Sequence, residues 1–194
     1  MDVDTSGAKP VSCRGWQKLV MAFIDKKVPD FVVIANRTNG YLNPEAGWRT
    51  FLDSAGKTVK TRKDALTVYK NSLTRTLAQI TKSGSRVIIL QDIPEPSLVI
   101  GQSVASVLLA SESTSGLHLS SMFSDQTVSA MERVIARQFT EVYIVNPKLA
   151  LCSNTYCEIR ENGKSIYQDH LHLSEFGSRK LSVLLKSALL SPLK

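Results

Sequence analysis

Two residues near the carboxyl end of the chain, Asp169 and His172, have the types and spacing of a catalytic pair. A carboxylate that accepts a hydrogen bond from one imidazole nitrogen fixes the tautomer of the ring, so the other nitrogen can take a proton from a hydroxyl nucleophile. In this interpretation Asp169 orients the ring and His172 is the general base. The spacing leaves an alternative open, in which Asp169 is favoured by the dipole of the following helix and His172 is a surface residue.

The residues around this pair predict the elements that must position it. Asn162-Gly163 separates two β-patterned runs, residues 156–160 and 165–167, and this dipeptide accepts the positive φ of a tight hairpin turn. Ser174 is placed to cap a helix. The apolar stripe of that helix is Leu181, Leu184, Leu185 and Ala188. We therefore expect the pair on a short loop between a hairpin and a helix.

The sequence contains three cysteines, and two of them lie in this region. Cys152 and Cys157 enclose four residues and could form a disulfide in an oxidising compartment. A zinc site is the alternative, but no second pair of ligands has the right spacing, so the disulfide is favoured. Cys13 is then left without a partner, and we expect it to be a free, half-buried thiol.

Composition and charge exclude several classes of protein. The chain has 194 residues, 43% of them hydrophobic and 21% charged, which suits one domain with a real core. The net charge of +7 comes from Lys and Arg spread along the whole length, without aromatic interleaving or a nucleic-acid motif. We expect no nucleic-acid role, and an acidic glycan or an anionic membrane explains the charge equally well. No apolar run is long enough to span a bilayer, and the sequence opens without the features of a signal peptide.

Continuous apolar runs at 31–35, 86–90 and 142–145 are typical of parallel strands that are covered on both faces. Segments with helical periodicity precede the first of these runs and separate the runs from one another. The first helix has an expected buried face of Trp16, Leu19, Val20, Phe23 and Ile24. The second opens at Thr61 and Asp64, and the third at Ser124. This order predicts a three-layer α/β/α sandwich with a parallel sheet.

Polar residues follow the first of these strands at its carboxyl end, where ligands bind in open α/β sheets. Asn36, Arg37 and Asn39 are the candidates, and a polar turn at Asn39-Gly40 is the alternative. The segment 97–123 is rich in Ser and small apolar residues, and we interpret it as an insertion that could form a lid. Within it His118 is expected to be a packing or surface residue.

The block from Asp169 through His172 to Leu-Ser-Glu-Phe-Gly resembles the last signature of the SGNH hydrolase superfamily. The cysteine pair, the Asn-Gly hairpin and Tyr167 before it resemble the SGNH domains of membrane acyltransferases that O-acetylate bacterial surface polysaccharides, including lipopolysaccharide. This resemblance implies a Ser-His-Asp mechanism without cofactor or metal, acting between an acyl donor and a glycan acceptor. It also implies a membrane acyltransferase portion upstream and a periplasmic or extracellular location.

The resemblance also assigns the residues that would bind the oxyanion. The segment from Pro29 to Asn39 is similar to the superfamily block whose Asn is an oxyanion-hole donor, which places Asn39 in that role. Arg37 stands where the block has Gly, so Asn36 or Arg37 could be the donor instead. Gly7 is a weaker match to the Gly that contributes a backbone donor.

The superfamily's nucleophile is missing, because no Gly-Asp-Ser occurs anywhere in the sequence. We therefore expect residues 1–194 to be one SGNH-like domain that is incomplete at its amino end, lacks its first strand and is inactive or nearly so alone. Two alternatives stay open. One is a non-catalytic glycan-binding or scaffold domain of the same fold; the other is an intact enzyme with another nucleophile, such as Ser6, Ser12 or Ser174.

Overall fold

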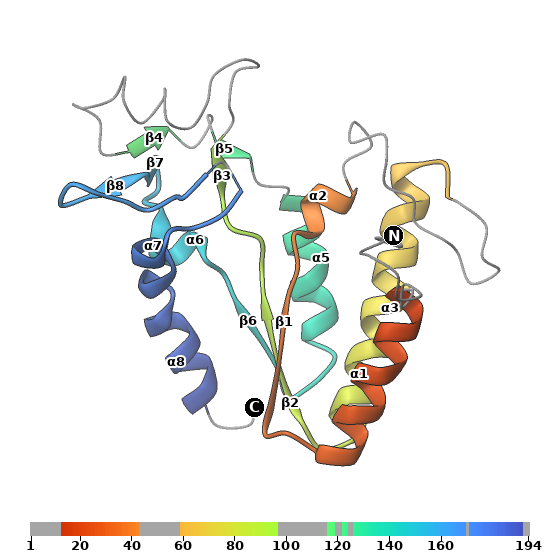
Figure 1. The fold of residues 1–194 in the computed structure, drawn as a ribbon. Helices are drawn as coiled ribbons and strands as arrows, with labels where there is room; N and C mark the ends of the chain where they lie inside the picture. Colours follow the sequence, from red (N-terminus) through yellow and green to blue (C-terminus); the bar gives the residue numbers. More distant parts are fainter. Residues whose placement is uncertain are drawn as a thin grey trace, which may run out of the picture.

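The computed structural model describes residues 13–42, 59–96, 116–118, 122–123, 126–169 and 171–191. A sheet of three parallel strands lies at its centre, in the spatial order β1-β2-β6 (Figure 1). The strands are β1 (Phe31–Ala35), β2 (Arg86–Leu90) and β6 (Val142–Val145). All three form where the sequence has its continuous apolar runs, which confirms the predicted parallel sheet.

Helices cover both faces of this sheet. One face carries α1 (Cys13–Lys27), α3 (Arg62–Lys82) and α5 (Gln126–Ala136), and the other carries α8 (Ser182–Leu190) (Figure 1). Successive side chains of β2 point to opposite faces of the sheet. Val87 and Ile89 pack with the first group of helices, and Ile88 packs with α8. The predicted three-layer α/β/α sandwich is therefore confirmed.

The remaining elements gather beyond the carboxyl ends of the strands (Figure 1). Three are short helices: α2 (Thr38–Leu42), α6 (Lys148–Leu151) and α7 (Glu175–Lys180). The others pair as β3 (Glu95–Pro96) with β5 (Met122–Phe123), β4 (Gly116–His118) with β7 (Tyr156–Glu158), and β8 (Arg160–Glu161) with β9 (Lys164–Ser165). A separate apolar cluster supports this region. It contains Leu151, Cys157, Ile159, Ile166, Tyr167 and Leu181.

Two sequence signals near the carboxyl end are confirmed. Asn162 and Gly163 have φ values of 49° and 75° and form the turn between β8 and β9, as the Asn-Gly dipeptide predicts. Ser174 caps α7 by accepting a hydrogen bond from the N–H of Gly177. The expected single closing helix is divided at Leu181 into α7 and α8.

Within the expected insertion 97–123, the structure describes β4 and β5 only. Strand β4 pairs with β7 of the hairpin, and β5 pairs with β3 in the segment after β2. The rest of the insertion and the side chain of His118 lie outside the described residues. The lid stays a prediction.

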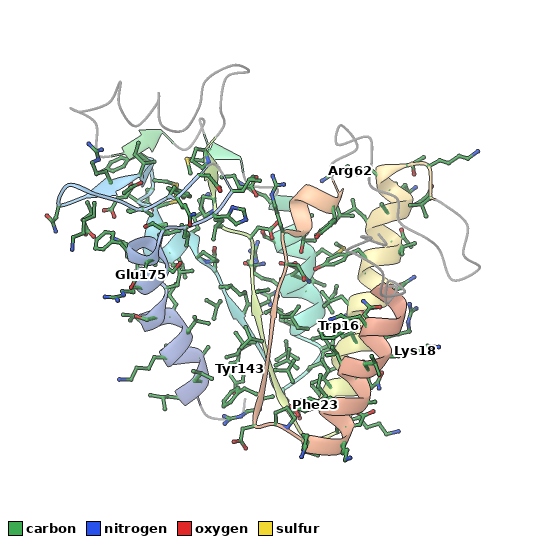
Figure 2. The ribbon with its side chains drawn as sticks, viewed as in Figure 1. Trp16, Lys18, Phe23, Arg62, Tyr143 and Glu175 are labelled. Carbon is green, nitrogen blue, oxygen red and sulfur yellow. A yellow bond between two sulfur atoms is a disulfide. The ribbon has the colours of Figure 1, made fainter. Side chains whose placement is uncertain are left out.

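The buried face expected for α1 is partly wrong. Ile24 is buried and Val20 packs against the same core, but Trp16, Leu19 and Phe23 are 62%, 60% and 59% exposed. Figure 2 shows Trp16 and Phe23 on the opposite side of α1 from Lys18. The reason is that α1 contacts α3 through its Val20 and Ile24 face, and no other described element covers the adjoining apolar row.

Strand β1 differs from its prediction in the same way. None of its residues is buried, and Val33 is 51% exposed, whereas its partner Ile88 on β2 is fully buried. Among the described strands β1 pairs with β2 alone, so its second edge is open. Continuous apolarity correctly predicted a strand of a parallel sheet, but not its position at the edge.

Candidate active site

Asp169 and His172 are in direct contact. The Nδ1 atom of His172 lies 2.8 Å from Oδ2 and 3.0 Å from Oδ1 of Asp169. Oδ1 also accepts the backbone N–H groups of Leu171 and His172 at 2.7 and 2.8 Å, so the loop itself fixes the carboxylate. When Nδ1 donates to Asp169, the other ring nitrogen, Nε2, is the one left to accept a proton.

These hydrogen bonds favour the ionised form of the acid. The bond from His172, followed by those from the two backbone N–H groups, holds the pKa of Asp169 below its usual range. Asp169 is therefore a carboxylate near neutral pH and can accept from the imidazole. The arrangement has the geometry of an orienting acid and a base, and both side chains are exposed to solvent, His172 by 70% and Asp169 by 44%.

Ser174 attaches this loop to both of its neighbouring elements. Its hydroxyl donates to the carbonyl of Ser165 at 2.6 Å and accepts from the N–H of Gly177 at 3.0 Å. Its own N–H donates to the carbonyl of Ile166 at 2.9 Å. The start of α7 and the end of the hairpin are thus joined on either side of Asp169 and His172. The hydroxyl of Ser174 is used in this structural role, which argues against Ser174 as a nucleophile.

The hairpin is itself anchored at two points. Cys152 and Cys157 form the predicted disulfide, and Cys157 is fully buried. On α7, Lys180 lies 2.8 Å from a carboxylate oxygen of Glu158 and 3.1 Å from one of Glu161. The disulfide and the ion pairs hold the hairpin against the short helices α6 and α7.

Tyr167 connects the loop to the end of strand β2. Its ring is buried, and its hydroxyl donates to the carbonyl of Pro94 at 2.8 Å. Burial raises the pKa of Tyr167 above its ordinary value, so the hydroxyl stays a donor. The segment after β2 therefore supports the element that carries Asp169 and His172.

The same segment binds the end of strand β1. Arg37 donates from Nε and Nη2 to the two carboxylate oxygens of Glu95 at 2.6 and 2.7 Å, a bidentate ion pair. The residue before Glu95 is Pro94, whose carbonyl accepts the hydrogen bond from the hydroxyl of Tyr167. Pro94 therefore contacts the element that carries Asp169 and His172, and Glu95 contacts the end of β1. Both regions lie beyond the carboxyl ends of the parallel strands.

The predicted oxyanion residues are only partly described. The guanidinium of Arg37 is engaged with Glu95, which raises the pKa of Arg37 and gives it a role in holding the loop. Asn39 lies on α2, whose first residue, Thr38, donates its N–H to Oδ1 of Asp92 at 2.9 Å. The side chains of Asn39 and Cys13 and all of Gly7 lie outside the described residues. Their roles stay predictions.

Sequence reasoning missed a buried polar network beneath α2. Glu132 is only 3% exposed and accepts hydrogen bonds from the hydroxyl of Tyr69 at 2.7 Å and from Nε2 of Gln91 at 2.9 Å. Tyr69 also lies 3.4 Å from the hydroxyl of Thr38, so the network reaches the start of α2. The signal was present in the sequence: Glu132 falls between Val128 and Ile135 on the apolar face of α5.

Across the part of the chain that the structure describes, no helix has both the length and the apolarity to cross a membrane. A comparison with curated proteins found no match. Among solved structures, the periplasmic domain of the lipopolysaccharide acetyltransferase of Salmonella ser. Paratyphi A is similar, with a TM-score of 0.62 and 16% sequence identity over 98% of this chain and 67% of that chain. This likeness shows a shared fold.

A family model described as an SGNH domain fused to AT3 domains matches residues 2–187. The match includes the hairpin, the disulfide and the Asp169–His172 loop as well as all three strands of the sheet. The chain therefore belongs to the family of SGNH domains that are fused to AT3 domains.

Proposed function

We propose that this chain is the larger part of an SGNH acyltransferase domain that transfers an acyl group to a cell-surface glycan. The observation that carries the proposal is the Asp169–His172 contact at the carboxyl ends of the parallel strands. Membership in the family adds a membrane acyltransferase portion as the expected partner, and the similar lipopolysaccharide acetyltransferase domain supports a periplasmic location.

In the proposed reaction a serine outside this sequence attacks the carbonyl carbon of the acyl donor. Nε2 of His172 takes the serine proton, and Asp169 stabilises the imidazolium that forms. The tetrahedral oxyanion collapses, the donor leaves with that proton, and an acyl-serine remains. A glycan hydroxyl then attacks the acyl-serine and gives its proton to His172, and the released serine recovers that proton. Asn39 is our candidate for donating a hydrogen bond to the oxyanion.

The missing serine is proposed to arrive on a strand that pairs with the open edge of β1. Unpaired strand edges and contiguous exposed apolar surface are features that folded proteins usually cover. Here Val33 is exposed on the face of the sheet that α8 covers, β1 has an open edge among the described strands, and the row formed by Trp16, Leu19 and Phe23 is exposed on α1, which covers the other face. Covering each of these large side chains would contribute about 1.5–3 kcal/mol. We therefore interpret them as the surface for the rest of the domain.

The test compares this chain with a version extended upstream through the preceding coding sequence. We expect p-nitrophenyl acetate hydrolysis and acyl transfer to a glycan from the extended chain, and little or none from the chain alone. In the extended chain His172→Ala should lower kcat on the order of 10⁶-fold and Asp169→Asn on the order of 10⁴-fold. Trp16→Gln with Phe23→Gln should destabilise the extended chain by several kcal/mol more than the chain alone.

The alternatives give different results. Hydrolysis by the chain alone that is lost in His172→Ala would indicate a nucleophile within it, such as Ser6 or Ser12. Glycan binding without turnover in either version, unchanged in His172→Ala, would indicate a binding or scaffold domain. An extended chain whose activity survives His172→Ala would contradict the proposed mechanism.

A further inference from the structure

A hollow of about 190 Å³ lies beyond the carboxyl ends of β2 and β6, beside α5. Its polar lining comes from the segment after β2, from α5 and from the segment after β6. The residues are Asp92, Gln126, Ser129, Arg133, Asn146 and Lys148. None of them belongs to the Asp169–His172 loop.

The charges of the hollow are unbalanced. Arg133 and Lys148 supply two cations, and neither has a carboxylate partner among the described residues. Arg37 and Lys180, by contrast, are paired with glutamates. The single acid of the lining, Asp92, accepts the N–H of Thr38. Two cations against the one carboxylate of Asp92 leave the lining with a net positive charge, which favours an anionic group.

Neutral donors surround these cations. Gln126, Ser129 and Arg133 are spaced i, i+3 and i+7, so they form one row along α5. The side-chain oxygen of Asn146 accepts the backbone N–H of Lys148 at 3.1 Å, which leaves the amide nitrogen as the group that can donate to a ligand. An arginine, a lysine, two amides and a hydroxyl around a small hollow suit a compact ligand with hydroxyl groups and one negative charge.

The hollow shares one residue, Pro94, with the supports of the candidate active site. Adjacent strands of a sheet are about 4.8 Å apart, so the ends of β2 and β6 lie roughly 5–10 Å from the end of β1. Pro94 lines the hollow and also receives the hydroxyl of Tyr167, two residues before Asp169. Pro94, in the lining of the hollow, therefore also supports the loop that carries Asp169 and His172.

We propose that this hollow binds an anionic sugar of the acceptor glycan, through a carboxylate or phosphate held by Arg133 and Lys148. The proposal rests on the proposed glycan acyltransferase function and names its substrate class. The volume is below the roughly 300–1,000 Å³ of sites for drug-sized ligands, which suits one sugar unit instead of a long segment. The sugar to be acylated would be a neighbour in the same glycan.

The test titrates glucuronate, glucose 6-phosphate, glucose and inorganic phosphate into the ¹⁵N-labelled chain and follows its amide signals. We expect one or both acidic sugars to shift the signals of residues 126–133 and 146–148, and glucose to bind much more weakly. Removing each charge-assisted contact should weaken binding about tenfold, so Arg133→Gln with Lys148→Gln should abolish it in practice. Arg75→Gln with Lys186→Gln removes the same charge from exposed positions elsewhere and should leave binding unchanged.

Each result has one meaning. Binding of glucuronate alone indicates a uronic acid, and binding of glucose 6-phosphate alone indicates a phosphorylated sugar. Equal binding of glucose and glucuronate, equal loss in both double variants, or shifts confined to other residues would overturn the proposal. Inorganic phosphate that binds as tightly as the sugar phosphate would mean an adventitious ion only. Because binding is measured on the chain without turnover, an inactive extended chain would contradict the proposed function and leave this result standing.

Discussion

Replacing Gly177 with Ala tests the packing that holds the Asp169–His172 loop on α7. Gly177 is buried in the first half of the helix and faces the backbone of Ile166. A methyl group at this position would overlap the carbonyl oxygen of Ile166 and lie 2.9 Å from its carbonyl carbon. The contacted atoms are backbone atoms of the hairpin, which cannot turn away as a side chain could. Helix and hairpin would have to separate.

The size of the effect follows from three contributions. Forcing a methyl group into packed space costs about 1–3 kcal/mol, and a rigid backbone neighbour favours the upper end. Separation also weakens the bond from the N–H of Ser174 to the carbonyl of Ile166, a loss of about 1 kcal/mol. Alanine offsets about 1 kcal/mol of this cost, because its helix propensity is higher than that of glycine. We therefore expect Gly177→Ala to lower the free energy of unfolding by about 3 kcal/mol.

Equilibrium unfolding in urea measures this change. With an m-value of about 2–3 kcal/mol per molar, the midpoint should fall by about 1 M. Ser178→Ala is the matched control, because Ser178 is the next residue of the helix and is exposed, and it should stay within about 0.5 kcal/mol of the parent. A Gly177→Ala protein that is as stable as the parent, or more stable, would refute the reasoning, since helix propensity alone predicts that result.

Three further predictions concern the same region. Tyr167→Phe leaves a buried carbonyl without its donor and should lower the free energy of unfolding by about 1–3 kcal/mol in urea titrations; no change would contradict the buried bond. Replacing Cys152 and Cys157 with Ser opens a six-residue loop and should cost about 2 kcal/mol, and the reduced parent should match the variant. The pKa of Asp169 is lowered by folding, so its contribution to stability is present above its ordinary pKa and is lost as pH falls through the lowered pKa of the folded state. Asp169→Asn should flatten that part of the pH profile.

Local sequence signals predicted the elements of the fold and the contact of its central pair. Apolar runs gave the three strands, and Asn162-Gly163 and Ser174 gave the hairpin turn and the cap, because each depends on residues close together in the chain. The contact between Asp169 and His172 is equally local. Spacing alone leaves the surface alternative open, and the pair is predicted because the block around Asp169 and His172 resembles the SGNH signature.

The long-range contacts that place this loop could not be predicted in the same way. Arg37 pairs with Glu95, 58 residues away, and Tyr167 donates to Pro94, 73 residues away. Nothing in the spacing of these residues encodes the pairing, which depends on how the segment after β2 crosses the ends of the strands. Glu132 is different, because an acid on an apolar helix face requires a partner and therefore signals a buried network.

The exposed row on α1 shows what periodicity can and cannot predict. A helical pattern identifies residues that share a face, and Trp16, Leu19 and Phe23 do share one, but the pattern contains no information about which segment covers it. The same holds for β1, whose apolar run is typical of a strand covered on both faces although Val33 is 51% exposed and the second edge of β1 is open among the described residues. Helix and strand thus differ from expectation in one sense: each has apolar surface that no other described element covers. A strand added at the open edge of β1, as the proposed mechanism requires, would supply the neighbour that β1 lacks among the described strands.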